Sequence, residues 1–338
     1  MWTEPRTRRP RPVRAARSLA PLAIALALAL GIGAYVIDRV APAGSGSAVG
    51  PSSQDYVAFD TLPRTKSGAS GLVVPSYTEE CGRNEEGHRN ADNVVVSPGY
   101  TNGAHHAHDY VGNLSTDALS TNRSLAAART TCRDGDRSTY YWPVLRRQDQ
   151  PTTTKGGGGD ATIHGNIGRI IDPVSVTVEY RGNPVSDVVP MPRFLRMITG
   201  DPVAGTQGDA NAHAQWGCST APGSFTPLYP RCPDGARLMR TLDFPSCWNG
   251  LDTDSPDHRT HIVFPAANGA CPHGTFAVPQ LRITLTYDVD PDSPFALDAF
   301  SEQRHSPKTD HALFIDVMTD SQMAAVVRCI NARKQCVT

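Results

Sequence analysis

The chain has 338 residues, a formal net charge of −1 and eight cysteines. A nearly neutral chain lacks the basic surface that binding to a nucleic-acid backbone requires, so we expect no nucleic-acid partner. The cysteine count is even and no Cys-x-x-C pair occurs, which favours disulfides over a zinc ribbon or a thioredoxin-type redox centre.

The first 38 residues predict a membrane anchor. Residues 1–18 contain six arginines and one acid, and residues 19–37 contain no charge. A helix of that length spans about 28 Å, close to the hydrocarbon thickness of a bilayer. We therefore expect a cytoplasmic basic segment at 1–18, a transmembrane anchor or signal at 19–38 that enters the lipid bilayer through residues 19–37, and an extracytoplasmic location for the rest. The protein is then a single-pass protein of the cell membrane, and a secreted protein with a cleaved signal peptide is the alternative.

Beyond the anchor, composition separates a tether from one large domain. Residues 39–70 are rich in Ala, Gly, Ser and Pro and predict a flexible tether. Residues 71–338 contain all eight cysteines and predict one extracytoplasmic, disulfide-containing domain, with a glycine-rich surface loop at 150–160. Ordering the cysteines by loop length suggests the pairs Cys81–Cys132, Cys218–Cys232, Cys247–Cys271 and Cys329–Cys336, although the sequence alone leaves the pairing open.

Strand patterns dominate this domain. Residues 281–289 alternate apolar and polar side chains without interruption, and residues 174–180 do so nearly as well. Residues 93–97 and 261–264 are shorter candidates, and residues 191–197 are interpreted as a strand with basic edges.

One helix is well marked, near the C-terminus. Thr319 to Gln322 form a capping box, and Met318 and Met323 can pack together as a hydrophobic staple around it. The fold class that we expect is mainly β, with a β-sandwich or jelly-roll-like core, long irregular loops, this C-terminal helix and the N-terminal transmembrane helix.

Histidines gather in three short segments that are far apart in the sequence. The segments contain His105, His106 and His108, then His258 and His261, and finally His311. Imidazole titrates near neutral pH and is the commonest metal ligand in proteins. The three segments therefore predict an acid–base or metal site that forms when the chain folds.

The spacing of these residues suggests how they can act together. His106 and His108 are two apart, so both point to the same face of an extended strand. If His261 or His311 joins them, three imidazoles can hold a divalent metal such as zinc with one position open, although the sequence leaves the cofactor unknown. The metal set that we expect is His106, His108 and His261. The full set of candidate catalytic residues is His106, His108, Asp109, His258, His261 and His311.

Three aspartates, Asp109, Asp257 and Asp310, each adjoin a histidine. Because adjacent side chains diverge, we expect each aspartate to orient a histidine from another segment. The alternative is that the histidines are structural residues, either hydrogen-bonded in the core or solvated in loops.

Three aromatic residues are candidates for substrate binding. Tyr141, Trp142 and Trp248 have planar faces that can stack on sugar rings, although an aromatic beside a cysteine or in a proline-rich segment is more often part of the core. Neither a G-x-S-x-G elbow nor a phosphate-binding P-loop occurs, so a serine triad and nucleotide chemistry have no support in the sequence.

A series of distinctive motifs spans the predicted domain. The motifs are HAHDYVGN at 106–113, TTC at 130–132, DRS at 136–138, YWP at 141–143, PMPRFLRM at 190–197, FPSCWNG at 244–250, SPDHRTH at 255–261, PQLR at 279–282 and HSPKTDH at 305–311. Through them, residues 93–336 resemble the family called domain of unknown function 1996, which occurs in secreted or surface-exposed proteins of fungi and actinobacteria. The resemblance implies an envelope or polysaccharide context, because fungal relatives sometimes carry cell-wall-associated domains. It implies no established reaction and no assigned catalytic residue.

Two functions from different classes are compatible with these features. The first is a membrane-anchored extracytoplasmic hydrolase or lyase that acts on envelope polysaccharide through the histidine-rich site. The second is a non-catalytic surface module that binds glycan or cell wall through aromatic and polar loop residues. The first requires the histidine segments to converge, and the second requires exposed aromatic faces.

Overall fold

The computed structural model describes residues 50–61, 74–149 and 165–338. All of them belong to the compact unit Ala48–Thr338. The predicted cytoplasmic segment, the predicted anchor at 19–38 and the glycine-rich loop at 150–160 lie outside the described residues. Within the described ranges, no helix combines the length and the apolar composition needed to cross a membrane.

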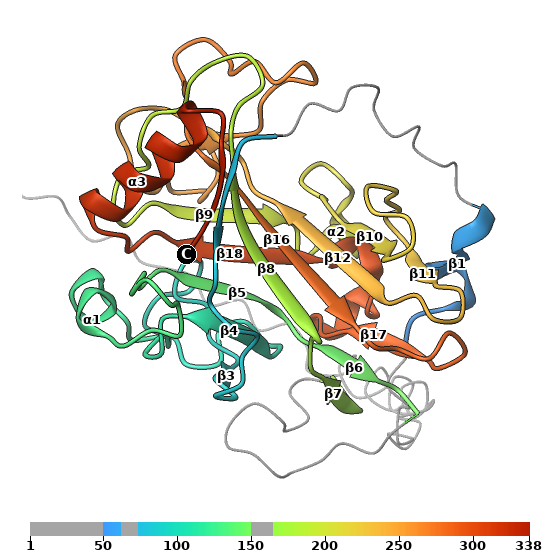
Figure 1. The fold of residues 1–338 in the computed structure, drawn as a ribbon. Helices are drawn as coiled ribbons and strands as arrows, with labels where there is room; N and C mark the ends of the chain where they lie inside the picture. The colour runs from blue at the N-terminus through green and yellow to red at the C-terminus, as the bar shows by residue number, and fades with distance from the viewer. Residues whose placement is uncertain (1–49, 62–73, 150–164) are drawn as a thin grey trace, which may run out of the picture. The chain divides into compact units, whose positions relative to one another are not determined.

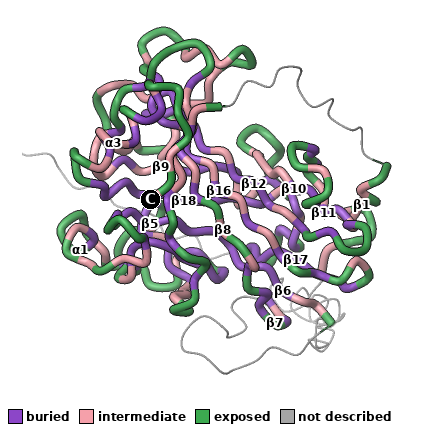
Figure 2. The backbone as a smooth tube through the Cα atoms, viewed as in Figure 1, coloured by how far each residue is buried: buried purple, intermediate pink, exposed green. Residues whose placement is uncertain are grey.

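The mainly β prediction is confirmed, and two large sheets supply most of the core (Figure 1). The six-stranded sheet has the order β10-β12-β16-β8-β2-β19, and the five-stranded sheet has the order β3-β4-β5-β18-β9. Trp142 and Phe314 of the second sheet share one hydrophobic cluster with Tyr180 and Leu285 of the first. Figure 2 shows that β5 and β18 of the five-stranded sheet are buried along their whole length, whereas β16 and β8 of the six-stranded sheet alternate between buried and less buried residues.

The strands have the following bounds. The six-stranded sheet comprises β10 (Gln215–Cys218), β12 (Leu238–Asp243), β16 (Gln280–Tyr287), β8 (Ser175–Arg181), β2 (Ser76–Glu79) and β19 (Gln335–Val337). The five-stranded sheet comprises β3 (Arg89–Asn90), β4 (His108–Gly112), β5 (Thr139–Pro143), β18 (His311–Ile315) and β9 (Arg196–Gly200). The smaller sheets are β1 (Tyr56–Ala58) with β11 (Tyr229–Arg231), β13 (Cys247–Trp248) between β14 (Ile262–Val263) and β15 (Phe276–Ala277), and β6 (Leu145–Arg147) between β17 (Phe295–Leu297) and β7 (Arg169–Ile171).

Helices are short apart from the last one. The α-helices are α1 (Asn122–Ala127), α2 (Ala204–Gln207) and α3 (Asp320–Asn331), and the 3-10 turns are η1 (Ser53–Asp55), η2 (Phe59–Thr61), η3 (Ser301–Gln303) and η4 (Pro307–Thr309). The predicted C-terminal helix is confirmed as α3. Its N-cap is Thr319, and the reciprocal bonds of a capping box link Thr319 and Gln322.

The register predicted for residues 281–289 is also confirmed. In β16 the side chains of Leu281, Ile283 and Leu285 are fully buried, and the intervening Arg282 pairs with Asp243 of β12. A slip of one residue would have inverted this pattern, so the alternation of apolar residues was sufficient to define the strand.

All four predicted disulfides are present. They join Cys81 to Cys132, Cys218 to Cys232, Cys247 to Cys271 and Cys329 to Cys336. No cysteine is left free. Disulfides of this number are typical of proteins from an oxidising compartment.

Two predicted strands and part of the predicted tether differ from the structure. Residues 93–97 form turns, because the Asn93 side chain accepts hydrogen bonds from the backbone N–H groups of Val95 and Val96. Of residues 191–197, only Arg196 and Met197 belong to a strand, because a turn precedes them and Phe194 has a φ of 71°. Residues 56–58, which were expected to lie in the flexible tether, form β1 and pair in parallel with β11.

Candidate functional site

Two strands of the five-stranded sheet each begin with a histidine. His108 is the first residue of β4, His311 is the first residue of β18, and β5 lies between these strands and pairs with both. The ring of His108 packs edge-on against the ring of Tyr141 in β5, with centroids 5.2 Å apart. His106 lies two residues before His108 in the segment that leads into β4. The sheet therefore brings together histidines that are more than 200 residues apart in the sequence.

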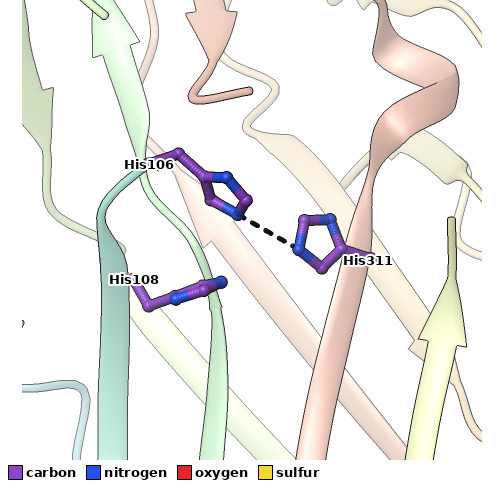
Figure 3. A group of neighbouring side chains, drawn as sticks. All are labelled: His106, His108 and His311. Atoms are coloured by element: carbon purple, nitrogen blue, oxygen red, sulfur yellow. Dashed lines mark hydrogen bonds between the residues drawn. The ribbon is translucent and has the colours of Figure 1, made fainter. Parts of the chain in front are cut away.

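The three imidazoles of His106, His108 and His311 form one cluster, which we call the histidine cluster (Figure 3). One ligand nitrogen from each ring lies within 4.8 Å of the other two. The Nε2 atoms of His106 and His311 are 3.2 Å apart. Two nitrogens bound at 2.0–2.1 Å to a tetrahedral zinc ion lie about 3.3 Å apart, so the separation of these two nitrogens matches that of two zinc ligands.

Backbone carbonyls determine which ring nitrogens of the cluster carry hydrogen. Nδ1 of His108 donates to the Asp92 carbonyl at 3.1 Å, and Nδ1 of His311 donates to the Thr309 carbonyl at 2.8 Å. Because a carbonyl oxygen only accepts, each Nδ1 must be protonated, which in a neutral ring leaves the lone pair on Nε2. Figure 3 shows the rings of His106 and His311 directed toward each other. Among the described residues, the buried Nε2 of His108 has no hydrogen-bond partner.

The histidine cluster is shielded from solvent and therefore uncharged. His106, His108 and His311 are 1%, 0% and 2% exposed. Burial lowers the pKa of all three imidazoles, and that of His311 falls to about 4. Positive charge on Arg240 and Arg259 lowers the pKa of His311 further. Neutral imidazole is the form that binds a metal ion.

Two buried ion pairs hold the segments that carry the cluster. Asp310, which directly precedes His311, accepts from Nη2 and Nε of Arg240 at 2.6 and 3.1 Å. Asp298 pairs with Arg146 and also accepts from the backbone N–H of Ala107, between the two other histidines of the cluster. All four charged side chains are fully or almost fully buried. Charges in such positions require their partners, so these pairs restrict both histidine-bearing segments.

The structure does not bring His258 and His261 into the cluster. His261 is buried, but Nδ1 is bonded to Ser255 Oγ at 2.8 Å and Nε2 to the Arg196 carbonyl at 2.7 Å. Both ring nitrogens of His261 are therefore occupied outside the cluster, and His311, rather than His261, is the third histidine beside His106 and His108. His258 pairs with Asp254 through Nδ1 at 2.9 Å. Both residues therefore stabilise the loop at 254–261.

The expectation that aspartates orient the histidines is also corrected. Asp109 is fully buried, but it accepts from Arg89 and from Asn84 rather than from an imidazole. Asp257 accepts from hydroxyl and backbone groups of its own turn, and Asp310 pairs with Arg240. The backbone carbonyls of Asp92 and Thr309 orient His108 and His311 instead. Every residue has a carbonyl, so no sequence pattern indicates which ones take this role.

The aromatic candidates differ in exposure. Tyr141 and Trp142 are fully buried in the core, where no sugar ring can stack on them. Trp248 is partly exposed, and its Nε1 donates to the Asp252 carbonyl at 2.7 Å. Phe276, opposite Trp248 in the neighbouring strand, is 53% exposed and was not singled out from the sequence.

Comparison with known proteins gives one result for the family. A family model described as "Domain of unknown function (DUF1996)" matches residues 93–315. This range includes the whole histidine cluster and both ion pairs. No significant match was found among curated proteins or among solved structures.

Proposed function

The chain belongs to the DUF1996 family, and we propose that its disulfide-containing domain holds one divalent transition-metal ion at His106, His108 and His311 and acts as a hydrolase or lyase on extracytoplasmic polysaccharide. The observation that carries the proposal is the convergence of three neutral imidazoles, two of which have their lone pair fixed on Nε2 by a backbone carbonyl. Three histidine ligands with one open position are typical of catalytic zinc sites.

The donor set favours zinc or a metal of similar preference. Imidazole nitrogen suits Zn, Cu, Fe and Ni, whereas Mg and Ca prefer oxygen. The cluster has no carboxylate among the described residues, and the cysteines are all in disulfides. When bound at such a site, a metal ion polarises an oxygen of the substrate and lowers the pKa of a bound water.

The location outside the cytoplasm is part of the same proposal. Four disulfides favour an oxidising compartment. The arginine-rich segment at 1–18 followed by the uncharged segment at 19–37 supports a single-pass anchor in the cell membrane, with the domain outside. Envelope polysaccharide is the substrate class that fits this location.

Access to the cluster depends on the side chains that cover it. The partly exposed ring of Phe300 packs edge-on against His106, with centroids 5.4 Å apart. The Phe300 ring also packs against the exposed ring of His105, with centroids 5.7 Å apart. Because the cluster itself is buried, a metal ion or substrate reaches it only when covering side chains such as Phe300 move.

Elemental analysis tests the metal site. The full chain, purified in detergent without chelator, is expected to contain about one metal ion per chain. His108→Ala is expected to lose it, because two imidazoles bind too weakly to retain an ion through purification. The matched control is His273→Ala, at an exposed histidine outside the cluster, which should keep the metal.

Once the metal content is known, an activity measurement tests the proposed reaction. Metal-loaded protein is incubated with polysaccharides, and new reducing ends or new unsaturated products are measured before and after chelation. Products that depend on the metal support the hydrolase or lyase. A metal-free wild-type chain that cannot be loaded with zinc would rule out the proposal.

One observation favours the second candidate function, a non-catalytic glycan-binding module. Trp248 and Phe276 are cross-strand neighbours and both reach the surface. For this alternative, a polysaccharide binds without product formation, and Phe276→Ala weakens the binding while His108→Ala leaves it unchanged.

A further inference from the structure

A small cavity lies beside the histidine cluster, on the neighbouring strand. It has a volume of about 160 Å³, and its walls include Ile198, His213, Arg259 and Phe264. Ligand sites for drug-sized molecules start at about 300 Å³, so this cavity suits one small ring.

Strand register places the cavity next to His311. In the pairing of β9 with β18, Gly200 is opposite His311 and Ile198 is opposite Leu313. Ile198 is therefore the diagonal neighbour of His311 on the same face of the sheet, and such neighbours typically lie about 7–8 Å apart. The wall of the cavity and the third imidazole of the cluster are thus adjacent side chains.

Arg259 lines the cavity and also contacts the strand that pairs with His311. Its Nη2 donates to the carbonyl of Gly200, the residue opposite His311, at 2.7 Å. Within the described part of the chain, no carboxylate forms an ion pair with Arg259. The carboxylates of Asp201 and Asp257 lie near enough to act on its charge without pairing with it, and Asp257 already accepts from Ser255 and from Thr260. A partly buried guanidinium with several remaining N–H groups therefore lines the cavity.

The other walls provide a flat, mainly apolar surface. The imidazole of His213 stacks on the ring of Phe264, with centroids 4.0 Å apart and an interplanar angle of 20°. Ile198 and Val263 add aliphatic surface, and no acidic side chain lines the cavity. A ligand that fits has an apolar ring face and one anionic group, which the planar guanidinium can bind through two oxygens.

We propose that this cavity binds a uronate, a sugar ring with a carboxylate, as the substrate unit adjacent to the histidine cluster. The inference rests on the proposed function and specifies its substrate class as a polysaccharide that contains uronic acid. Arg259 binds the carboxylate, and the stacked His213 and Phe264 form the wall beside the ring. Arg259 belongs to the same motif as His258 and His261, so this motif contributes to the site through its arginine rather than through its histidines.

Binding of two matched sugars tests the proposal. The full chain in detergent is titrated with methyl β-D-glucuronide and with methyl β-D-glucoside, which differ only in the carboxylate, and the dissociation constants are measured by NMR. We expect the glucuronide to bind at least ten times more tightly than the glucoside. Arg259→Met should remove this difference, and Arg259→Lys should retain part of it. Arg237→Met, at an exposed arginine elsewhere, should leave it unchanged.

The metal content of each variant separates this proposal from the previous one. Arg259→Met should keep its metal, whereas His108→Ala should lose the metal and still prefer the glucuronide. Equal affinity for the two sugars, or an unchanged preference in both Arg259 variants, would overturn the uronate site whatever the metal content. Binding of inorganic phosphate without binding of the glucuronide would show that the cavity selects a different anion and would also overturn it.

Discussion

His311 meets two requirements of a metal ligand at the same time. Its Nδ1 donates to a backbone carbonyl, which leaves the lone pair on Nε2, and burial keeps the ring neutral by lowering its pKa to about 4. The preceding residue, Asp310, is fixed by Arg240 on the other large sheet. The position of one imidazole thus depends on an ion pair between the two sheets.

Removing one partner of that pair has a large expected effect. Asp310→Asn leaves the buried Arg240 without its counter-charge and should lower the free energy of unfolding by about 3–5 kcal/mol. The matched control is Asp187→Asn. Its ion pair with Arg333 is exposed, and it should cost no more than about 1 kcal/mol. Urea denaturation of the three chains measures both values, and similar losses in the two variants would contradict a special role for the buried pair.

At the scale of elements, β5 determines the separation of the two histidine-bearing strands. Neighbouring strands lie about 4.8 Å apart, so the backbones of β4 and β18 are separated by roughly twice that distance. The rings of His108 and His311 nevertheless approach to 5.8 Å between centroids, because both side chains lean over β5. The cluster therefore requires all three strands in register.

The C-terminal helix offers a test of the capping interpretation. In α3 the Thr319 hydroxyl accepts from the backbone N–H of Gln322 at 3.3 Å. Thr319→Ala removes this acceptor and should lower the free energy of unfolding by about 1 kcal/mol. Thr319→Ser keeps a hydroxyl at the N-cap and should retain most of that stabilisation. Thermal unfolding of both variants provides the comparison, and equal losses would show that the hydroxyl is not the stabilising group.

The buried carboxyl at the end of β2 predicts a pH dependence of stability. Burial, together with Asp134 and Asp136, raises the pKa of Glu79 from 4.5 to about 10. Between these values the folded chain holds a proton that the unfolded chain has lost, so this group's contribution to stability falls as the pH rises. Glu79→Gln removes the titration, and its stability relative to wild type should increase from pH 5 to pH 9. Urea denaturation at several pH values measures the free energy of unfolding of both chains. A difference between Glu79→Gln and wild type that stays constant with pH would contradict the raised pKa of Glu79.

For the whole molecule, the four disulfides predict that no thiol is accessible. The native oxidised chain should not react with a thiol reagent, whereas the reduced and denatured chain should react at all eight cysteines. Mass spectrometry after labelling counts the modified cysteines. Labelling of a pair such as Cys247 and Cys271 without reductant would show that this disulfide is absent.

Short sequence patterns predicted the elements that depend only on interactions between residues close together in the chain. The alternation at 281–289 and the capping box at 319–322 define their elements without reference to the rest of the chain. The histidine cluster depends instead on the pairing of β4, β5 and β18, which joins distant segments and leaves no trace in spacing. For that reason the sequence suggested the motifs but placed His261, rather than His311, with His106 and His108. The orienting role of the two carbonyls and the position of Arg259 in the cavity wall were missed because both depend entirely on the tertiary structure.

The affinity for zinc tests the central claim most directly. Competition with a chelator gives the dissociation constant for the full wild-type chain, for His311→Ala and for His261→Gln. The account predicts that His311→Ala weakens zinc binding at least 100-fold, because one of three ligands is lost, whereas His261→Gln stays within about threefold of wild type. Equal weakening in both variants, or unchanged binding in His311→Ala, would contradict the assignment of His106, His108 and His311 as the metal site.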